Sequence, residues 1–166
     1  MYIDYYKNEK VAIKIKSTEN SITEITFVKG KEDIEDETTE NPLIKQCKKQ
    51  LDDYFKGKLK QFNIKYEYSG TPFQEKVWKE LLNIEYGTTI SYKELAQRIG
   101  SPKSVRAVAN AVGKNKIGII IPCHRIIGSN GTLTGYAGGL DNKKYLLEVE
   151  NSRTSKVLQI ISHKSE

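Results

Sequence analysis

The spacing of hydrophobic residues changes along the chain and predicts two structurally different parts. Near the N-terminus, apolar and polar residues alternate through residues 11–15, and apolar residues recur in 22–27, which predicts β-strands. Beyond Pro42, apolar residues recur at helical spacing as far as Gly57, which predicts an amphipathic helix. Alternation returns in residues 62–68 and predicts another strand or an extended connection.

After a change of composition at Ser69-Gly70, the pattern becomes mainly helical. Thr71 predicts the start of one helix, and the capping box Ser91-Tyr92-Lys93-Glu94 predicts the start of the next. Ser101-Pro102 predicts the cap of a third helix, which we expect to reach about Lys114. Two helices separated by so short a turn are typical of a helix-turn-helix, although many small helical proteins contain such a pair.

The last third of the chain predicts three more elements. The isoleucine-rich residues 119–127 are compatible with a buried strand. The turn Gly128-Ser129-Asn130-Gly131 then predicts a hairpin, which after a helix-turn-helix is called a wing. A final helix is expected from about Asp141 to Glu150, with Tyr145, Leu146 and Val149 on its inner side.

These elements predict a fold of the α+β or α/β class with two domains. Residues 1–69 are expected to form a small sheet-and-helix structural domain, and residues 70–150 a helical domain. The charged residues 31–40 are interpreted as a solvated loop, and residues 151–166 as a polar tail of unassigned function.

The charge of the chain is concentrated in its second part. The net charge is +6 over 166 residues, but residues 1–69 hold 13 basic and 13 acidic residues and are neutral. From Tyr86 to Ile126, the chain has seven basic residues and one acidic residue, Glu94. This excess is either a solvated face or, beside a predicted helix pair, a surface that contacts phosphates. No apolar run is long enough to span a membrane and no secretory signal is evident, so we expect a cytoplasmic protein.

The chain has two cysteines, Cys47 and Cys123, and the second has unusual neighbours. Cys47 lies on the apolar face of the predicted helix after Pro42, so we interpret it as a core residue. Cys123 belongs to Pro122-Cys123-His124-Arg125, which interrupts the isoleucine-rich stretch. Such a block is either a seat for a nucleophilic thiolate or a packed cysteine beside a structural histidine. The spacing of the cysteines and histidines matches no zinc module, so no metal is expected.

The wider sequence resembles the active-site region of the O6-alkylguanine-DNA alkyltransferases, from about Thr71 to Glu150. The resemblance rests on Ile121-Pro122-Cys123-His124-Arg125-Ile126, on the preceding Asn115, and on Gly135-Tyr136-Ala137-Gly138-Gly139-Leu140. It implies a ribonuclease H-like N-terminal domain and a winged-helix-like DNA-binding domain. The chain departs from the family at Lys114, Lys116 and Gly118, where the family commonly has Gly, Pro and Pro around the asparagine.

The resemblance implies the roles of five catalytic residues. Cys123 would be the nucleophile, His124 its base through a bound water, and Glu150 the group that orients His124. Tyr92 would give a proton to the leaving guanine, and Asn115 would hold the turn that carries the cysteine. The resemblance implies no cofactor. The alkyl group would remain on Cys123 as a thioether, so each molecule would react once.

The resemblance also implies how the protein meets its substrate. The partner would be double-stranded DNA containing O6-alkylguanine, or also O4-methylthymine, bound by a monomer. Arg106 would fill the place of the flipped base. The other expected DNA-binding residues are Ser91, Lys103, Ala107, Asn110, Lys114 and Arg125. The expected pocket residues are Tyr92, Ile126, Ile127, Tyr136 and Ala137.

Three other functions each agree with part of the sequence. A non-catalytic protein that flips and flags the damaged base would not need Cys123. A regulator of transcription that is switched by methylation would need an added N-terminal metal-cysteine module, for which this sequence has no candidate. A cysteine hydrolase finds no second candidate histidine here, because His163 lies in the polar tail.

Overall fold

The computed structural model describes residues 1–30, 34 and 37–150, which form two compact units. The first unit is Met1–Tyr68 together with Lys116–Ile120, and the second begins at Ser69 and excludes that short segment. The sequence predicted that all of residues 70–150 would belong to one domain, so the placement of Lys116–Ile120 is a difference. The polar tail of residues 151–166, and part of the charged loop of residues 31–40, lie outside the described residues.

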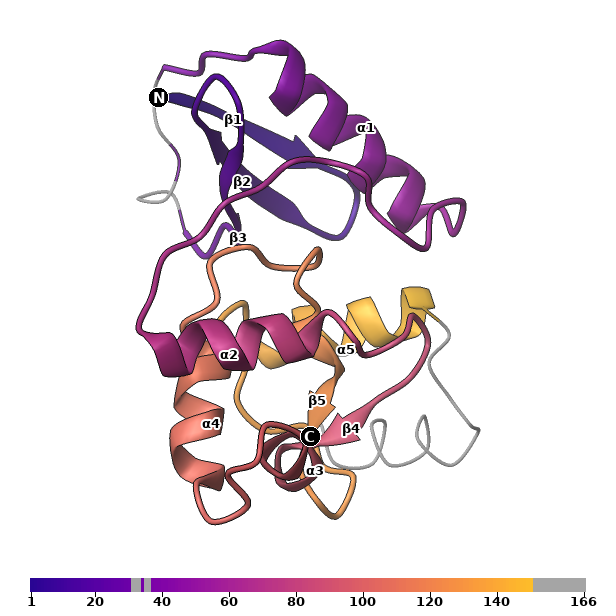
Figure 1. Cartoon of the computed structure of the whole chain (residues 1–166). Coiled ribbons are helices and arrows are strands. Elements are labelled where there is room, and N and C mark those ends of the chain that lie inside the picture. The colour runs from indigo at the N-terminus through magenta and orange to yellow at the C-terminus, as the bar shows by residue number, and fades with distance from the viewer. Residues whose placement is uncertain (31–33, 35–36, 151–166) are drawn as a thin grey trace. The chain divides into compact units, whose positions relative to one another are not determined.

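The first unit is built on a three-stranded antiparallel sheet in the order β1 (Tyr2–Lys7), β2 (Ala12–Ser17), β3 (Ile22–Phe27). In the register, Ile15 lies opposite Ile25, and the alternating isoleucines of β2 are fully buried. Helix α1 (Pro42–Phe55) packs against β1 and β2 (Figure 1). Its buried face includes Cys47, so the interpretation of this cysteine as a core residue agrees with the structure.

The free edge of β3 is covered by two segments from elsewhere in the chain. Ile22 forms a parallel bridge with Tyr66, which lies in the extended connection predicted for residues 62–68. Ile25 donates its N–H to the carbonyl of Lys116 at 2.8 Å and accepts the N–H of Gly118 at 2.9 Å. These two backbone bonds are why Lys116–Ile120 belongs to the first unit.

The segment that follows Gly118 contains a strained residue. Ile119 has a positive φ of 70°, although β-branched side chains strongly disfavour this conformation. The N–H of Ile120 bonds the carbonyl of Gly118 at 2.7 Å, which closes a γ-turn around Ile119. The side chain of Ile119 is buried, and its packing holds the backbone in this state.

The second unit is mainly helical. Helices α2 (Pro72–Leu81), α3 (Tyr92–Arg98) and α4 (Val105–Gly113) pack against one another (Figure 1). Thr71 caps α2 as expected and forms a capping box with Gln74. Trp78 is a core residue whose indole N–H bonds the carbonyl of Ala111 at 2.8 Å. The predicted mixed α+β class is therefore confirmed.

Three local predictions for this unit were wrong. Helix α4 begins at Val105 and not at Ser101, because Ser101 accepts the N–H of Ser104 in a tight turn. The turn expected at residues 128–131 is closed by the bond from the N–H of Gly128 to the carbonyl of Thr132 at 2.8 Å, but no second strand of the expected wing follows β5 (Ile126–Ile127) among the described residues, and β5 pairs in parallel with β4 (Ile90–Ser91). Residues 119–127 are not one strand, because a short 3₁₀-helix, η2 (Cys123–Arg125), interrupts them.

Helix α5 (Leu140–Glu150) closes the described part of the second unit and packs against η2. Its buried face consists of Lys143, Leu146, Leu147 and Glu150, so two of four inner positions are charged. Tyr145 and Val149, which were expected there, are only half-buried. No helix among the described residues is long and apolar enough to cross a membrane.

Candidate active site

The thiol of Cys123 lies at the start of η2, just after a tight turn. Pro122 has φ −81° and ψ 62°, and the N–H of Cys123 bonds the carbonyl of Ile121 at 2.7 Å. The side-chain amide of Asn115, which follows α4, donates to the carbonyl of Ile121 at 3.0 Å and to the sulfur of Cys123 at 3.2 Å. Asn115 therefore fixes both the turn before the cysteine and the sulfur itself.

His124 is fully buried and bonded to Glu150. Its Nε2 lies 2.6 Å from Oε2 of Glu150. Burial lowers the pKa of His124, and the carboxylate only partly offsets this, so the ring is neutral near neutral pH. Nε2 then carries the proton that is donated to Glu150. Nδ1 has no hydrogen-bond partner among the described residues, so its lone pair can accept a proton.

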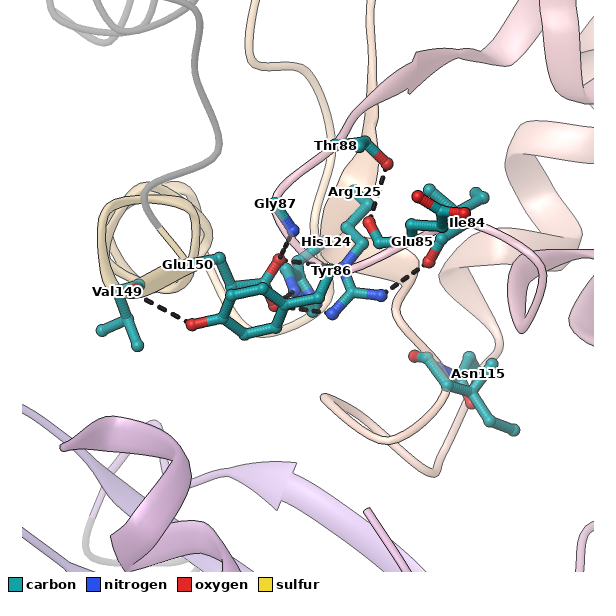
Figure 2. Close-up of polar contacts among 11 residues, drawn as sticks. Ile84, Glu85, Tyr86, Gly87, Thr88, Asn115, His124, Arg125, Val149 and Glu150 are labelled. Carbon is teal, nitrogen blue, oxygen red and sulfur yellow. Dashed lines mark hydrogen bonds and ion pairs between the residues drawn. The ribbon is translucent and has the colours of Figure 1, made fainter. Parts of the chain in front are cut away.

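Arg125 completes this network and corrects the expectation that it binds DNA. Its guanidinium donates to Oε1 of Glu150 at 2.8 Å, to Oε2 at 2.9 Å and to the carbonyl of Ile84 at 2.7 Å (Figure 2). Gly87 donates its N–H to Oε1 of Glu150 at 3.3 Å. The side chain of Arg125 is buried, so its positive charge pairs with Glu150 inside the unit and is not presented at the surface.

The network keeps Glu150 ionised. Burial by itself would raise the pKa of this carboxyl, but His124 and Arg125 together hold the pKa well below its ordinary value. A carboxylate at the C-terminal end of a helix is unfavourably placed with respect to the helix dipole, so specific partners are needed there. The structure supplies those partners from η2.

A cavity of about 720 Å³ opens beside Cys123. Its walls come from α3, from α4 and from the loop of residues 129–137. The lining residues are Tyr92, Val105, Arg106, Ala109, Val112, Gly113, Cys123, Ser129, Thr134, Gly135, Tyr136 and Ala137. Tyr92, Tyr136 and Ala137 were expected here. Backbone groups near Ile126 and Ile127 were also expected here; the two residues are not among the lining residues, and their side chains are buried.

Lys143 is a site residue that the sequence analysis missed. It is fully buried on α5, and its ammonium donates to the carbonyls of Thr134 at 3.1 Å and Gly135 at 3.4 Å. The hydroxyl of Tyr92 donates to the same two carbonyls, at 3.1 and 3.4 Å. Burial lowers the pKa of Lys143 to about 8, although the nearby Cys123 opposes the shift. The signal in the sequence was a lysine that shares a helix face with Leu146, Leu147 and Glu150.

The two cysteines differ in their surroundings. Burial raises the pKa of Cys47 to about 12, with no group to offset it, so this thiol is inert. Burial also raises the pKa of Cys123, but Asn115, Lys143 and Tyr136 oppose the increase. Cys123 is therefore the thiol with the means to form a thiolate.

Comparison with known proteins agrees with this chemistry. Residues 72–152 match the model of the 6-O-methylguanine DNA methyltransferase DNA-binding domain, and residues 1–68 match that of the ribonuclease-like domain of the same proteins. The chain belongs to the 6-O-methylguanine DNA methyltransferase family.

Individual members of the family are similar over almost the whole chain. A methylated-DNA–protein-cysteine methyltransferase from Methanosarcina barkeri is 44% identical over 155 residues, which are 92% of this chain and 98% of the relative. The crystal structure of Mycobacterium tuberculosis OGT in complex with DNA has a TM-score of 0.82 at 37% identity, covering 96% of this chain and 99% of that one. An O6-methylguanine DNA methyltransferase from Methanococcus jannaschii has a TM-score of 0.67 at 29% identity, with coverage of 91% and 95%.

The remaining residues that the family resemblance proposed for DNA binding fall into two groups. The first group is exposed on α4 or next to it and consists of Lys103, Arg106, Ala107, Asn110 and Lys114. Ser91 stands apart, because its hydroxyl accepts the N–H of Glu94 at 3.0 Å and caps α3. The described residues contain no group of three or more His, Cys, Asp and Glu side chains that could hold a metal ion.

Proposed function

We propose that Cys123 accepts the alkyl group of O6-alkylguanine in DNA in a single, irreversible step. Family membership makes the chain a DNA-repair methyltransferase that acts by direct reversal. The observation that supports Cys123 as the acceptor is its position: this residue borders a cavity of about 720 Å³, and Asn115 donates a hydrogen bond to its sulfur at 3.2 Å. O4-methylthymine presents a similar alkyl ether and is a second expected substrate.

The reaction needs two proton movements and one displacement. His124 takes the thiol proton on Nδ1, through a water molecule, and Glu150 and Arg125 orient the ring through Nε2. The thiolate gives an electron pair to the alkyl carbon as the carbon–oxygen bond breaks, and that bond's pair goes to the guanine. The guanine takes a proton from Tyr92. A thioether is chemically stable towards the side chains that line the described cavity, so Cys123 stays alkylated.

The exposed face of α4 supports binding to duplex DNA. Arg106 is the one long side chain in the middle of that face, and it also lines the cavity. It can therefore fill the place in the duplex that a flipped base leaves, as base-flipping proteins require. The neighbouring Lys103 and Lys114 are exposed and suited to phosphates. We propose that a monomer acts, in a reducing compartment such as the cytoplasm, because the nucleophile must remain a free thiol.

A non-catalytic protein that only flips and flags the lesion is the second candidate function. It needs the cavity but not the thiol. The hydrogen bond from Asn115 to the sulfur and the network behind His124 favour transfer over this alternative.

The test is mass spectrometry after incubation with duplex DNA that contains one O6-methylguanine. We expect one methyl group per protein, on Cys123, and no further repair when DNA is in excess. Cys123→Ser should bind the duplex and accept no methyl, while Cys47→Ala, as the matched control, should accept one. Repair that continues well beyond one equivalent, or a methyl on Cys47, would refute the proposal.

A further inference from the structure

The sulfur of Cys123 has two side-chain hydrogen-bond donors from separate parts of the second unit. One is the amide of Asn115, after α4, at 3.2 Å. The other is the hydroxyl of Tyr136, in the loop before α5, which is hydrogen-bonded to Cys123. Tyr136 also lines the cavity. The residue as a whole is half-buried, but its hydroxyl group is buried.

The hydroxyl of Tyr136 is a reliable donor. Burial raises the pKa of Tyr136 well above its ordinary value, and the neighbouring sulfur raises it further, so the phenol keeps its proton at any pH at which the protein works. The sequence placed Tyr136 in the expected pocket but gave its hydroxyl no role. Its hydroxyl, however, is directed to the nucleophile.

The titratable groups around the sulfur divide into two sets. Lys143 from α5 and the Tyr136 hydroxyl favour the thiolate, as does the amide of Asn115. The charge of Cys123 also contributes to the raised pKa of Tyr92 from α3, after burial, but the Tyr92 hydroxyl donates its hydrogen bonds to the carbonyls of Thr134 and Gly135. The hydrogen bond of His124 is directed at Glu150, so this ring can take the proton away but does not hold the anion.

We propose that Tyr136 is a catalytic residue whose hydroxyl, together with the amide of Asn115, binds the thiolate of Cys123 until it attacks the alkyl carbon. This inference rests on the proposed alkyl transfer. As the sulfur–carbon bond forms, the sulfur gives up its negative charge and both hydrogen bonds weaken. The charge moves to the guanine with the electron pair of the breaking carbon–oxygen bond, and the proton of the Tyr136 hydroxyl stays on Tyr136.

This hydrogen bond raises the thiolate population and lowers the nucleophilicity of the thiolate, and these opposed effects give a recognisable dependence of the reaction rate on pH. Loss of one donor to an ionised sulfur should reduce the thiolate population on the order of ten-fold below the titration midpoint. A less stabilised thiolate is also a better nucleophile, by roughly three-fold for such a change, because nucleophilicity rises with basicity. Tyr136→Phe should therefore react more slowly than the wild type near neutral pH and faster on the alkaline plateau.

The experiment measures the rate at which iodoacetamide alkylates Cys123, as a function of pH, with the modified peptide identified by mass spectrometry. Iodoacetamide reports on the thiolate without needing guanine binding or a proton from Tyr92. Cys47 does not interfere, because burial raises its pKa to about 12. The variants are Tyr136→Phe, Tyr136→Leu as a second side chain without a hydroxyl, and Tyr66→Phe as the matched control in the other unit. Thermal unfolding of each variant checks that it is folded.

We expect the pH profiles of wild type and Tyr136→Phe to cross, with the midpoint moved to higher pH, and the profile of Tyr66→Phe to coincide with that of the wild type. Parallel profiles with an unchanged midpoint would overturn the proposal and leave Tyr136 as a wall of the pocket. The same protein is then tested with O6-methylguanine DNA. If the profiles cross but no methyl is transferred, the alkyl-transfer function fails while the role of Tyr136 towards the thiol stands.

Discussion

Replacement of Arg125 by methionine tests whether the buried network, and not the surface, is where this arginine acts. Arg125→Met keeps most of the apolar stem and removes all three hydrogen bonds to Glu150 and the carbonyl of Ile84. The side chain of Glu150 is 0% exposed, so its charge cannot turn to water. Removal of one partner from a buried ion pair costs about 3–5 kcal/mol.

A second arginine provides the matched control. Arg98 also makes two hydrogen bonds to one carboxylate, at 2.6 and 3.1 Å to Glu94, but the two side chains are 37% and 46% exposed. Arg98→Met should cost only about 0.3–0.5 kcal/mol, because water replaces the lost partner. The two variants thus remove similar contacts in different environments, and the difference between them measures the effect of burial.

The assay is urea unfolding at neutral pH, with the free energy of unfolding compared between wild type and the two variants. We expect Arg125→Met to lose at least about 3 kcal/mol, which for a chain of this size lowers Tm by roughly 2–4 °C per kcal/mol. The loss should also depend on pH. A carboxyl whose folded pKa lies below its ordinary value of 4.5 stabilises the fold above that pH, and the contribution is lost as the pH falls through the folded pKa.

The difference between wild type and Arg125→Met should therefore shrink as the solution is acidified below about pH 4.5, where Glu150 becomes protonated in the unfolded chain. The reasoning is wrong if Arg125→Met unfolds with the same free energy as Arg98→Met, or if its loss of stability is the same at neutral and acidic pH. Either result would mean that Glu150 is not held as a buried anion by Arg125.

Two further predictions concern substrate and backbone. Arg106→Ala should slow the repair of methylated duplex DNA far more than the reaction with free O6-benzylguanine, because a free base needs no flipping; equal losses in the two rate assays would exclude a role in extrusion. Ile119→Gly should destabilise the protein by about 1–2 kcal/mol less than Ile117→Gly, since both remove a buried isoleucine but only Ile119 has a positive φ. Equal unfolding free energies would show that the turn at Ile119 stores no strain.

The linear pattern of residues predicted the elements whose causes are local. Helix α1 begins where Asn41 and Pro42 place a cap and a first turn, and α2 begins at the capping box of Thr71. The exposed face of α4 could also be read from its spacing. The prediction failed where the local signal was ambiguous. Serine suits a turn as well as a helix cap, so the start of α4 was wrongly expected at Ser101, which forms a turn with Ser104.

The site divides in the same way. The block around Cys123, the position of Asn115 and the pocket residues Tyr92, Tyr136 and Ala137 were named from the sequence, and the structure brings them together. Their chemical roles are predictions that methyl transfer and iodoacetamide alkylation test. Ile126 and Ile127 were expected to offer backbone groups to the base, and this stays a prediction; the structure adds that their side chains are buried and that β5 pairs with β4.

The sequence by itself identified Cys123, His124 and Glu150 as candidates, because their residue types and positions resemble the motif of a known family. Only the tertiary structure decided which charges act inside the protein. Lys143 and Arg125 look like surface cations in the sequence, and each becomes internal because its partners come from distant segments: the carbonyl of Thr134 for one, Glu150 for the other. Burial raises the cost of leaving such charges unpaired, so contacts that no local pattern encodes determine where they act.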